Sequence, residues 1–248
     1  MKKIINDPSA IVEEMLAGLV ASYPQLIHQV EDSRVVAKNA THKQVGLVSG
    51  GGSGHEPAHA GFVGDGMLSA AVLGDVFTSP TPDQILTGIK EADQGQGVLL
   101  IVKNYTGDIL NFEMAKDMAE MEDITAEIVV VDDDIAVENS TYTAGKRGVA
   151  GTILVHKILG AAARQGRSLT ELKELGKQKN KLYDLLERGI YDEDTFIERS
   201  NNIGSRTEEI KDSIKTVKNR LSTVKKDNSK IIEDIKTVLS LYHDSDSL

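Results

Sequence analysis

The sequence predicts an α/β domain with a mostly parallel sheet flanked by helices, followed by a coiled-coil helical tail. Three observations support this fold class. Short apolar runs alternate with helical patterns, as in sheets covered by helices. Glycine-rich or polar segments directly follow several of the apolar runs, as expected at strand ends. Beyond residue 181 the composition changes and a heptad pattern begins.

Four apolar runs are expected to be strands: Val45–Ser49, Leu68–Leu73, Gly97–Lys103 and Ala126–Val131. The last two are almost continuously apolar, which is typical of strands buried on both faces. Helical patterns cover Ile11–Val20, Thr81–Ala92, Asp108–Met121, Val149–Gln165 and Leu169–Lys179. Because ligands bind beyond the carboxyl ends of strands in such sheets, we expect the segments after Ser49, Lys103 and Val131 to converge on one crevice.

A domain boundary is expected near residues 176–182. All five prolines and 20 of the 22 glycines precede Lys181, and no alanine follows it. We therefore assign residues 1–179 to the α/β domain and residues 181–248 to a separate segment.

The separate segment carries apolar residues at alternating steps of three and four from Ile203 to Tyr242, which is typical of a coiled-coil seam. Asn228 falls at a core position, where it would fix the register of paired helices. Alternatively, residues 226–229 (KDNS) form a turn and the helix folds back as a hairpin.

Composition excludes several function classes. The net charge of -10 disfavours direct nucleic-acid binding. The absence of cysteine rules out disulfides and thiolate metal sites. The sequence offers neither a signal peptide nor the ~20 consecutive apolar residues of a membrane span, so we expect a cytoplasmic protein without membrane contact.

The strongest local motif is SGGGSGHEP at residues 49–57. Its glycines let the backbone N–H groups of Gly51 and Gly52 approach a ligand directly. No Gly-Lys-Ser/Thr follows, so the motif is not a Walker A loop. His55 beside the glycines is the candidate functional histidine, and a flexible turn is the simpler alternative.

Residues 55–59 (HEPAH) formally match the zinc pattern H-E-x-x-H. That site needs an uninterrupted helix with both histidines on one face, whereas Pro57 fits only the first turn of a helix. We therefore predict no metal site here and expect His59 to be a packed or surface histidine.

Three further segments carry polar side chains suited to a site. Lys103 and Asp108 follow a buried strand, and Asp108 can accept a proton from a ligand hydroxyl. Alternatively, Asp108 or Thr106 simply caps the next helix. Ser79 lies in FTSPTPD (77–83), which helix capping also explains. The aspartates of 132–134 suit either Mg²⁺ or solvent, and YTAGKRG (142–148) suits a phosphate, a partner or a helix entry.

Four motifs carry a family resemblance: SGGGSGHEP (49–57), FTSPTPD (77–83), KNYTGDILN (103–111) and YTAGKRGVA (142–150). Together with the opening MKKIIND, they make residues 1–179 similar to the K subunit of bacterial phosphotransferase-linked dihydroxyacetone kinases. The resemblance implies that dihydroxyacetone is the substrate. The implied catalytic residues are His55 and Asp108, and the implied substrate-binding residues are Gly51, Gly52, Ser79 and Lys103.

The same resemblance implies the cofactors and partners. ATP or ADP and Mg²⁺ would be held by a separate L subunit, with no cofactor on this chain, and the K subunit would form a homodimer. Family members continue into a second domain whose histidine binds the substrate covalently. The only histidine after residue 181, His243, matches no family motif. We therefore expect impaired kinase activity, because a small ketone has few other contacts.

Residues 181–199 (KLYDLLERGIYDEDTFIER), the heptads and residues 238–247 (VLSLYHDSDS) are similar to the coiled-coil arm of large serine recombinases. In that family the arm mediates contacts between subunits. The alternative function is therefore a non-catalytic interaction protein with a coiled-coil partner, formed by fusion of the two segments.

Overall fold

The computed structural model describes residues 5–40, 42–134, 136 and 145–187, with side chains up to residue 178. The predicted coiled-coil seam, Asn228, the alternative hairpin, the recombinase-like arm from residue 188 onward and His243 lie outside the described residues. The first structural unit ends at Glu187. Its last helix, α5 (Leu169–Glu187), runs through the composition change at 176–182.

A six-stranded mixed sheet with the order β1-β2-β4-β3-β5-β6 forms the centre of this unit. The four strands β4, β3, β5 and β6 are parallel, and β1 and β2 add an antiparallel edge. This confirms the predicted mostly parallel sheet. The strands are β1 (Ile27–Gln29), β2 (Val35–Lys38), β3 (Gly46–Ser53), β4 (Ala70–Val76), β5 (Val98–Lys103) and β6 (Ala126–Val131).

The two antiparallel strands β1 and β2 were not predicted. They span three and four residues, which is too short for a periodic pattern to stand out. Their position is set by pairing of β2 with β4, so a contact distant in sequence determines them.

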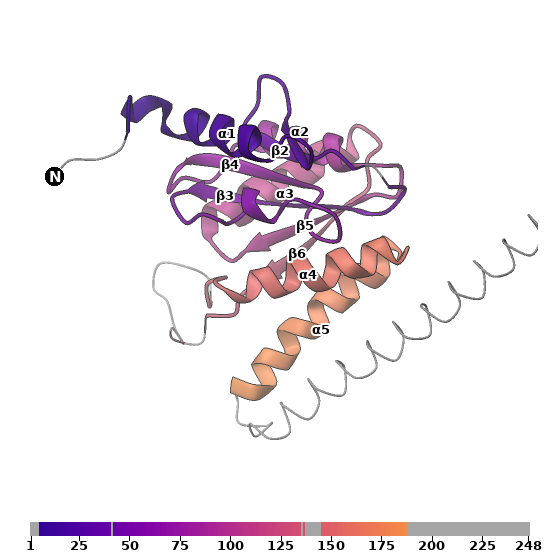
Figure 1. The fold of residues 1–248 in the computed structure, drawn as a ribbon. Coiled ribbons are helices and arrows are strands. Elements are labelled where there is room, and N and C mark those ends of the chain that lie inside the picture. The colour runs from indigo at the N-terminus through magenta and orange to yellow at the C-terminus, as the bar shows by residue number, and fades with distance from the viewer. Residues whose placement is uncertain (1–4, 41, 135, 137–144, 188–248) are drawn as a thin grey trace, which may run out of the picture. The chain divides into compact units, whose positions relative to one another are not determined.

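Helices cover both faces of the sheet (Figure 1). One face packs against α1, α4 and α5, and the other against α2 and α3. These helices are α1 (Ile11–Ser22), α2 (Pro82–Ala92), α3 (Thr106–Glu120), α4 (Gly151–Arg164) and α5, with short 3₁₀ turns η1 (Pro8–Ala10) and η2 (Ala60–Phe62). All five helices were predicted, with ends that differ by a few residues, and α5 extends further than expected. Among the described helices, none is long and apolar enough to cross a membrane.

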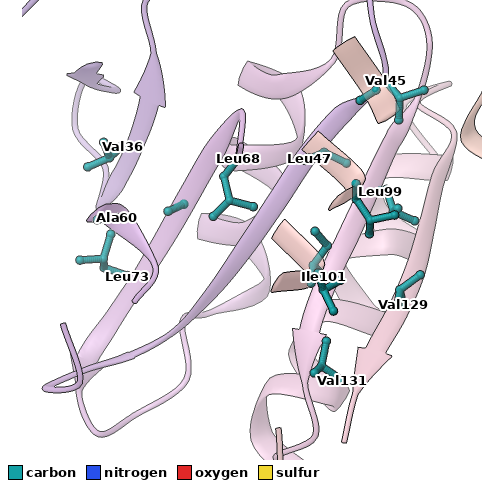
Figure 2. Close-up of a cluster of buried hydrophobic side chains, with 14 of the residues drawn as sticks. Val36, Val45, Leu47, Ala60, Leu68, Leu73, Leu99, Ile101, Val129 and Val131 are labelled. Atoms are coloured by element: carbon teal, nitrogen blue, oxygen red, sulfur yellow. The ribbon is translucent and has the colours of Figure 1, made fainter. Parts of the chain in front are cut away.

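Side chains of β5 alternate between two hydrophobic clusters. Leu99 and Ile101 join the cluster on the α4 face, shown in Figure 2, whereas Leu100 and Val102 join the cluster on the α2–α3 face. Because consecutive strand residues point to opposite faces, Lys103 at the end of β5 lies on the α4 face. The hydrophobic alternation therefore directs a buried cation to one particular side of the sheet.

The first five residues of the glycine motif, 49–53, belong to a strand rather than to the predicted loop. Gly50, Gly51 and Gly52 pair with β4 as part of β3. A Cβ on Gly50 would lie 2.5 Å from the carbonyl oxygen of Val72, and one on Gly52 would lie 2.5 Å from the backbone nitrogen of Thr78. The glycines allow neighbouring backbone to approach β3 closely, and the strand continues into the site.

Candidate active site

A cavity of about 620 Å³ lies at the carboxyl ends of the parallel strands, against the start of α4. Its polar wall includes four residues singled out from the sequence: His55, Ser79, Lys103 and Asp108. Gly52 lines it as well. The cavity therefore unites the segments that follow β3, β4 and β5. Of the three segments predicted to converge, those after Ser49 and Lys103 line it, whereas residues 132–134 after Val131 are not among its lining residues.

Three polar groups converge over Gly51. A Cβ built on this glycine would lie 3.6 Å from Oδ2 of Asp108, 3.6 Å from Nε2 of His59 and 3.8 Å from Nε2 of His55. A carboxylate and two imidazoles thus gather around Gly51, whose missing side chain leaves room between them. All three residues line the cavity, so a small polar ligand bound there can contact them.

Asp108 is held in place by Ser79. The Ser79 hydroxyl donates a hydrogen bond to Oδ1 of Asp108, which directs Oδ2 toward the point above Gly51. Burial raises the pKa of Asp108, while the Ser79 hydrogen bond and the Lys103 ammonium lower it. The capping alternative for Asp108 and Thr106 is wrong, because Tyr105 is the N-cap of α3 and no side chain caps it.

Lys103 and His55 form the second pair in the cavity. The Nζ atom of Lys103 lies 2.8 Å from Nε2 of His55. Partial burial of the imidazole and the positive charge of Lys103 both lower the pKa of His55. Burial also lowers the pKa of Lys103, against the opposing effect of Asp108. A neutral His55 therefore accepts the hydrogen bond of the Lys103 ammonium.

The floor of the cavity contains His59 and His156, with ring centroids 5.5 Å apart. His59 is 3% exposed, and burial lowers its pKa well below the usual range. Burial likewise lowers the pKa of His156 to about 3. Both imidazoles are therefore neutral at physiological pH.

The segment 55–59 forms turns rather than a helix, so it does not have the geometry of an H-E-x-x-H zinc site. The expectation that His59 is packed agrees with its burial, but His59 also lines the cavity, which was not predicted. His156 and Thr152 of α4 were missed too. A histidine in the middle of an alanine-rich apolar helix was the one available signal.

Asp133 and Asp134 contact the segment that leads into α4. Asp133 accepts hydrogen bonds from the backbone N–H groups of Val149, at 2.8 Å, and Gly151, at 2.6 Å, at the start of α4. Asp134 pairs with Arg147 at 3.0 Å. These contacts fasten α4, and with it one wall of the cavity, to the end of β6. The predicted loop 142–148 is described only from Gly145 onward.

Comparison with known proteins identifies the family. The model of the Dak1 domain matches residues 17–184. The chain belongs to the Dak1 domain family. The matched residues include the whole cavity, so the site belongs to the Dak1 domain.

Curated proteins with a similar Dak1 domain include two bacterial kinase subunits. The chain is 68% identical over 179 residues to the dihydroxyacetone-binding subunit DhaK of PTS-dependent dihydroxyacetone kinase 1 from Listeria innocua. It is 51% identical over 181 residues to DhaK of the PEP-dependent dihydroxyacetone kinase of Escherichia coli. These matches cover 72% and 73% of this chain, but 54% and 51% of the relatives. The chain thus spans about half the length of these curated relatives.

Solved structures confirm the α/β fold. The dihydroxyacetone kinase of C. freundii, in complex with AMP-PNP and Mg²⁺, matches with a TM-score of 0.69 and 40% identity, over 73% of this chain and 34% of that one. The operon co-activator DhaQ matches with a TM-score of 0.63 and 43% identity, over 67% and 51% of the two chains. The same domain therefore occurs in both a kinase and a co-activator.

The Dak1 cavity does not suit a divalent cation. The Lys103 ammonium lies beside His55 and opposes a second positive charge. Within the described residues, no group of three histidine, aspartate or glutamate side chains is arranged to hold a metal ion. The polar groups of the cavity are suited instead to a neutral molecule with hydroxyl and carbonyl oxygens.

Proposed function

We propose that this Dak1 domain binds dihydroxyacetone in the cavity lined by Gly52, His55 and Asp108 and presents one hydroxyl of the ligand to Asp108. Gly51, predicted as a second glycine of the site, lies beside these groups but is not among the lining residues. The observation that carries this proposal is the convergence of Asp108, His55 and His59 within 4 Å of one point. The comparisons support it, because the relatives at 68% and 51% identity are dihydroxyacetone-binding subunits.

Asp108 is the proposed proton acceptor. Its Oδ2 faces the ligand point, and its raised pKa brings it closer to the value that suits a general base. The ligand hydroxyl gives its proton to Oδ2 as its oxygen bonds to the donor's phosphorus, while the bond between that phosphorus and the donor's leaving group breaks. Ser79 holds Asp108 in position through Oδ1. His55 and Lys103 act as a pair, since the ammonium fixes the imidazole and supplies positive charge near the reacting oxygen.

Nucleotide and Mg²⁺ are proposed to come from a separate L subunit. The Lys103 ammonium beside His55 disfavours a second cation in the cavity, which supports this assignment. The rim also exposes apolar side chains of Phe77, Val149 and Ile153. An apolar rim around a polar cavity is typical of a surface that another polypeptide covers. A homodimer of the kind implied by the resemblance remains a prediction.

We further propose that the 248 residues by themselves bind dihydroxyacetone without a covalent bond and support little phosphoryl transfer. No position after residue 181 matches the covalent histidine that the resemblance implies. A ligand of six non-hydrogen atoms held only by hydrogen bonds is expected to bind with a Kd of about 1–10 mM.

Titration of the full chain with dihydroxyacetone, followed by NMR, tests binding. Saturable shifts are expected at His55, Asp108 and Gly51, and Asp108→Asn should change them. Thr78→Ala is the control, because the exposed Thr78 hydroxyl bonds to the carbonyl of Val76 and not to the site. A parent chain that shows no saturable shifts at 50 mM, about five times the weakest expected Kd, contradicts the proposed function. A coupled assay with an L subunit and its phosphoryl donor tests catalysis, and rapid turnover would contradict the predicted impairment.

The heptads between Ile203 and Tyr242 favour a second candidate, an interaction protein whose recombinase-like arm pairs with another helix. Sedimentation of the full chain is compared with that of Val217→Lys, which charges one core position. Loss of a larger species in the variant supports pairing through the seam, and equal masses for both proteins contradict it.

A further inference from the structure

Buried polar atoms without partners gather at the floor of the cavity. Among the described residues, the side-chain atoms in this state are Nε2 of His59, Oγ1 of Thr152, both ring nitrogens of His156, and atoms of Lys38 and Gln44. Lys38 and Gln44 line a separate hollow of about 20 Å³. The other three residues, each at most 3% exposed, all line the large cavity. Buried polar groups normally have partners, so this concentration indicates a place for polar atoms of a ligand.

The hydrogen bonds of Ser49 determine which nitrogen of His59 carries the proton. The Ser49 hydroxyl donates to the carbonyl oxygen of Ile101 at 2.6 Å. Its oxygen lies 3.1 Å from Nδ1 of His59 and therefore accepts a hydrogen bond from Nδ1–H. Since the imidazole is neutral, Nε2 carries a lone pair and no proton. His59 thus presents a hydrogen-bond acceptor to the cavity.

Nε2 of His59 and Oδ2 of Asp108 belong to two residues that both line the cavity, and each atom lies 3.6 Å from the Cβ position of Gly51. Both atoms are acceptors, so a ligand that bonds to both needs two donors. A ketone with one hydroxyl on each side of its carbonyl has this arrangement, with one hydroxyl for Asp108 and one for His59.

We propose that Nε2 of His59 accepts a hydrogen bond from the second, non-reacting hydroxyl of the bound ketone and thereby selects ligands that carry it. This assignment rests on the proposed function and adds a specificity-determining residue to it. A site built to bind a hydroxyl disfavours the analogue that lacks it, because the buried acceptor then stays unpaired. Hydroxyacetone, in which one hydroxyl of dihydroxyacetone is replaced by hydrogen, is the matching probe.

Two substitutions of His59 distinguish its Nε2 acceptor from the hydrogen bond that its Nδ1 makes with Ser49. In His59→Asn, the amide nitrogen lies close to the position of Nδ1 and keeps the bond to Ser49, but the acceptor is lost. In His59→Gln, the amide oxygen reaches close to the position of Nε2 and restores the acceptor. We expect dihydroxyacetone to bind about 3- to 10-fold more weakly to His59→Asn, with hydroxyacetone almost unaffected, and His59→Gln to recover the preference.

The binding constants of both ketones are measured by NMR titration of the full chain and of the two variants. A smaller preference for dihydroxyacetone in His59→Asn and a recovered preference in His59→Gln support the proposal. If both ketones lose the same amount of affinity in both variants, His59 has only a structural role. If the preference for dihydroxyacetone is unchanged, His59 has no role in binding. Either result overturns the proposal.

A measurement on the unmodified chain removes any dependence on the folding of the variants. Long-range ¹H–¹⁵N spectra identify Nε2 of His59 as the unprotonated nitrogen and follow it during the titration. Dihydroxyacetone should shift this nitrogen, and hydroxyacetone should shift it much less. Saturable shifts at Asp108 and Gly51 without one at His59 overturn this inference alone, whereas the absence of any saturable shift overturns the proposed function as well.

Discussion

The Ser79 hydroxyl donates its hydrogen bond to Oδ1 of Asp108, and this bond fixes the direction in which the other carboxylate oxygen points. Ser79 follows β4 and Asp108 lies in the first turn of α3, so the bond also joins two segments that the sheet brings together. Ser79 thereby positions the proposed proton acceptor.

Ser79→Ala should raise the pKa of Asp108 further. The hydrogen bond from Ser79 stabilises the carboxylate, so its removal favours the protonated form. The ¹³C titration of the Asp108 carboxyl group is expected to move to higher pH. Thr78→Ala, one residue earlier and bonded elsewhere, should leave this titration in place. A titration that moves to lower pH in Ser79→Ala contradicts the described hydrogen bond.

Asp108→Asn should stabilise the fold at pH 7 while removing activity. The pKa of Asp108 in the folded protein is raised above its ordinary value of 3.8 by burial. The stabilising effect of a raised pKa is present below the unfolded value and is lost as pH rises through the folded value. At pH 7 the buried carboxylate therefore costs stability, and asparagine relieves this cost.

Thermal unfolding of Asp108→Asn is measured at pH 7 and near pH 3.5. A higher Tm than the parent is expected at pH 7, with the difference shrinking at the lower pH. Asp117→Asn, at an exposed position of the same helix, serves as the control. Loss of a general base should also reduce any phosphoryl transfer in the coupled assay by about 10²- to 10⁴-fold. Unchanged turnover would remove Asp108 from the mechanism.

Lys103→Met should raise the pKa of His55. The ammonium 2.8 Å from Nε2 disfavours a positive charge on the imidazole, and methionine keeps the length of the side chain without the charge. The pKa of His55 is read from its ¹H NMR titration. Lys177→Met, which removes an exposed lysine, is the matched control. If the pKa of His55 falls instead, the two side chains do not form the described pair.

Gly51→Ala should block ligand binding without disrupting the fold. A Cβ here meets no atom closer than 3.6 Å, yet it occupies the point between Asp108, His55 and His59. We expect loss of dihydroxyacetone binding by at least about 10-fold, since the methyl group displaces the ligand. The fold is checked by the amide spectrum.

Gly18→Ala is the control for this glycine substitution. Gly18 lies on the exposed side of α1, and nothing lies within 4 Å of its Cβ position. Alanine should raise the free energy of unfolding by about 0.5–1 kcal/mol, because it reduces the entropy of the unfolded chain. Binding should be unchanged. Normal ligand binding by Gly51→Ala would show that the ligand does not bind beside Gly51 of β3.

His156→Leu should make the fold less sensitive to acid. The pKa of His156 is about 3 in the folded protein, against an ordinary value of 6.5. The stability that comes from this lowered pKa is complete above pH 6.5 and is lost as pH falls toward 3. Between pH 6.5 and 3, the free energy of unfolding falls by about 1.4 kcal/mol for each pH unit.

Urea unfolding between pH 7 and 4.5 measures this dependence. The slope of unfolding free energy against pH should be smaller in His156→Leu than in the parent. Part of the slope should remain, because burial lowers the pKa of His59 as well. His42→Leu, at an exposed histidine, controls for the loss of an imidazole as such. An identical slope in parent and His156→Leu would show that another group governs the acid sensitivity.

The sequence by itself determined the parallel part of the sheet, the helices and the polar cavity residues His55, Ser79, Lys103 and Asp108. Continuous apolar runs such as Gly97–Lys103 have to be buried on both faces, and glycines at 50–52 admit close backbone contacts, so both features are visible in a linear pattern. The placement of Lys103, Asp108 and His55 at strand ends then follows from the geometry of parallel sheets.

Only the tertiary structure decided which polar side chains act together. Asp108 is bonded to Ser79 rather than to its own helix, and the tautomer of His59 depends on a hydroxyl that is itself bonded to Ile101. His156 lies in α4, about a hundred residues after His55 in the chain, yet both side chains line the same cavity. Such contacts depend on the direction of each side chain and on packing between distant segments, neither of which has a periodic signature in the sequence.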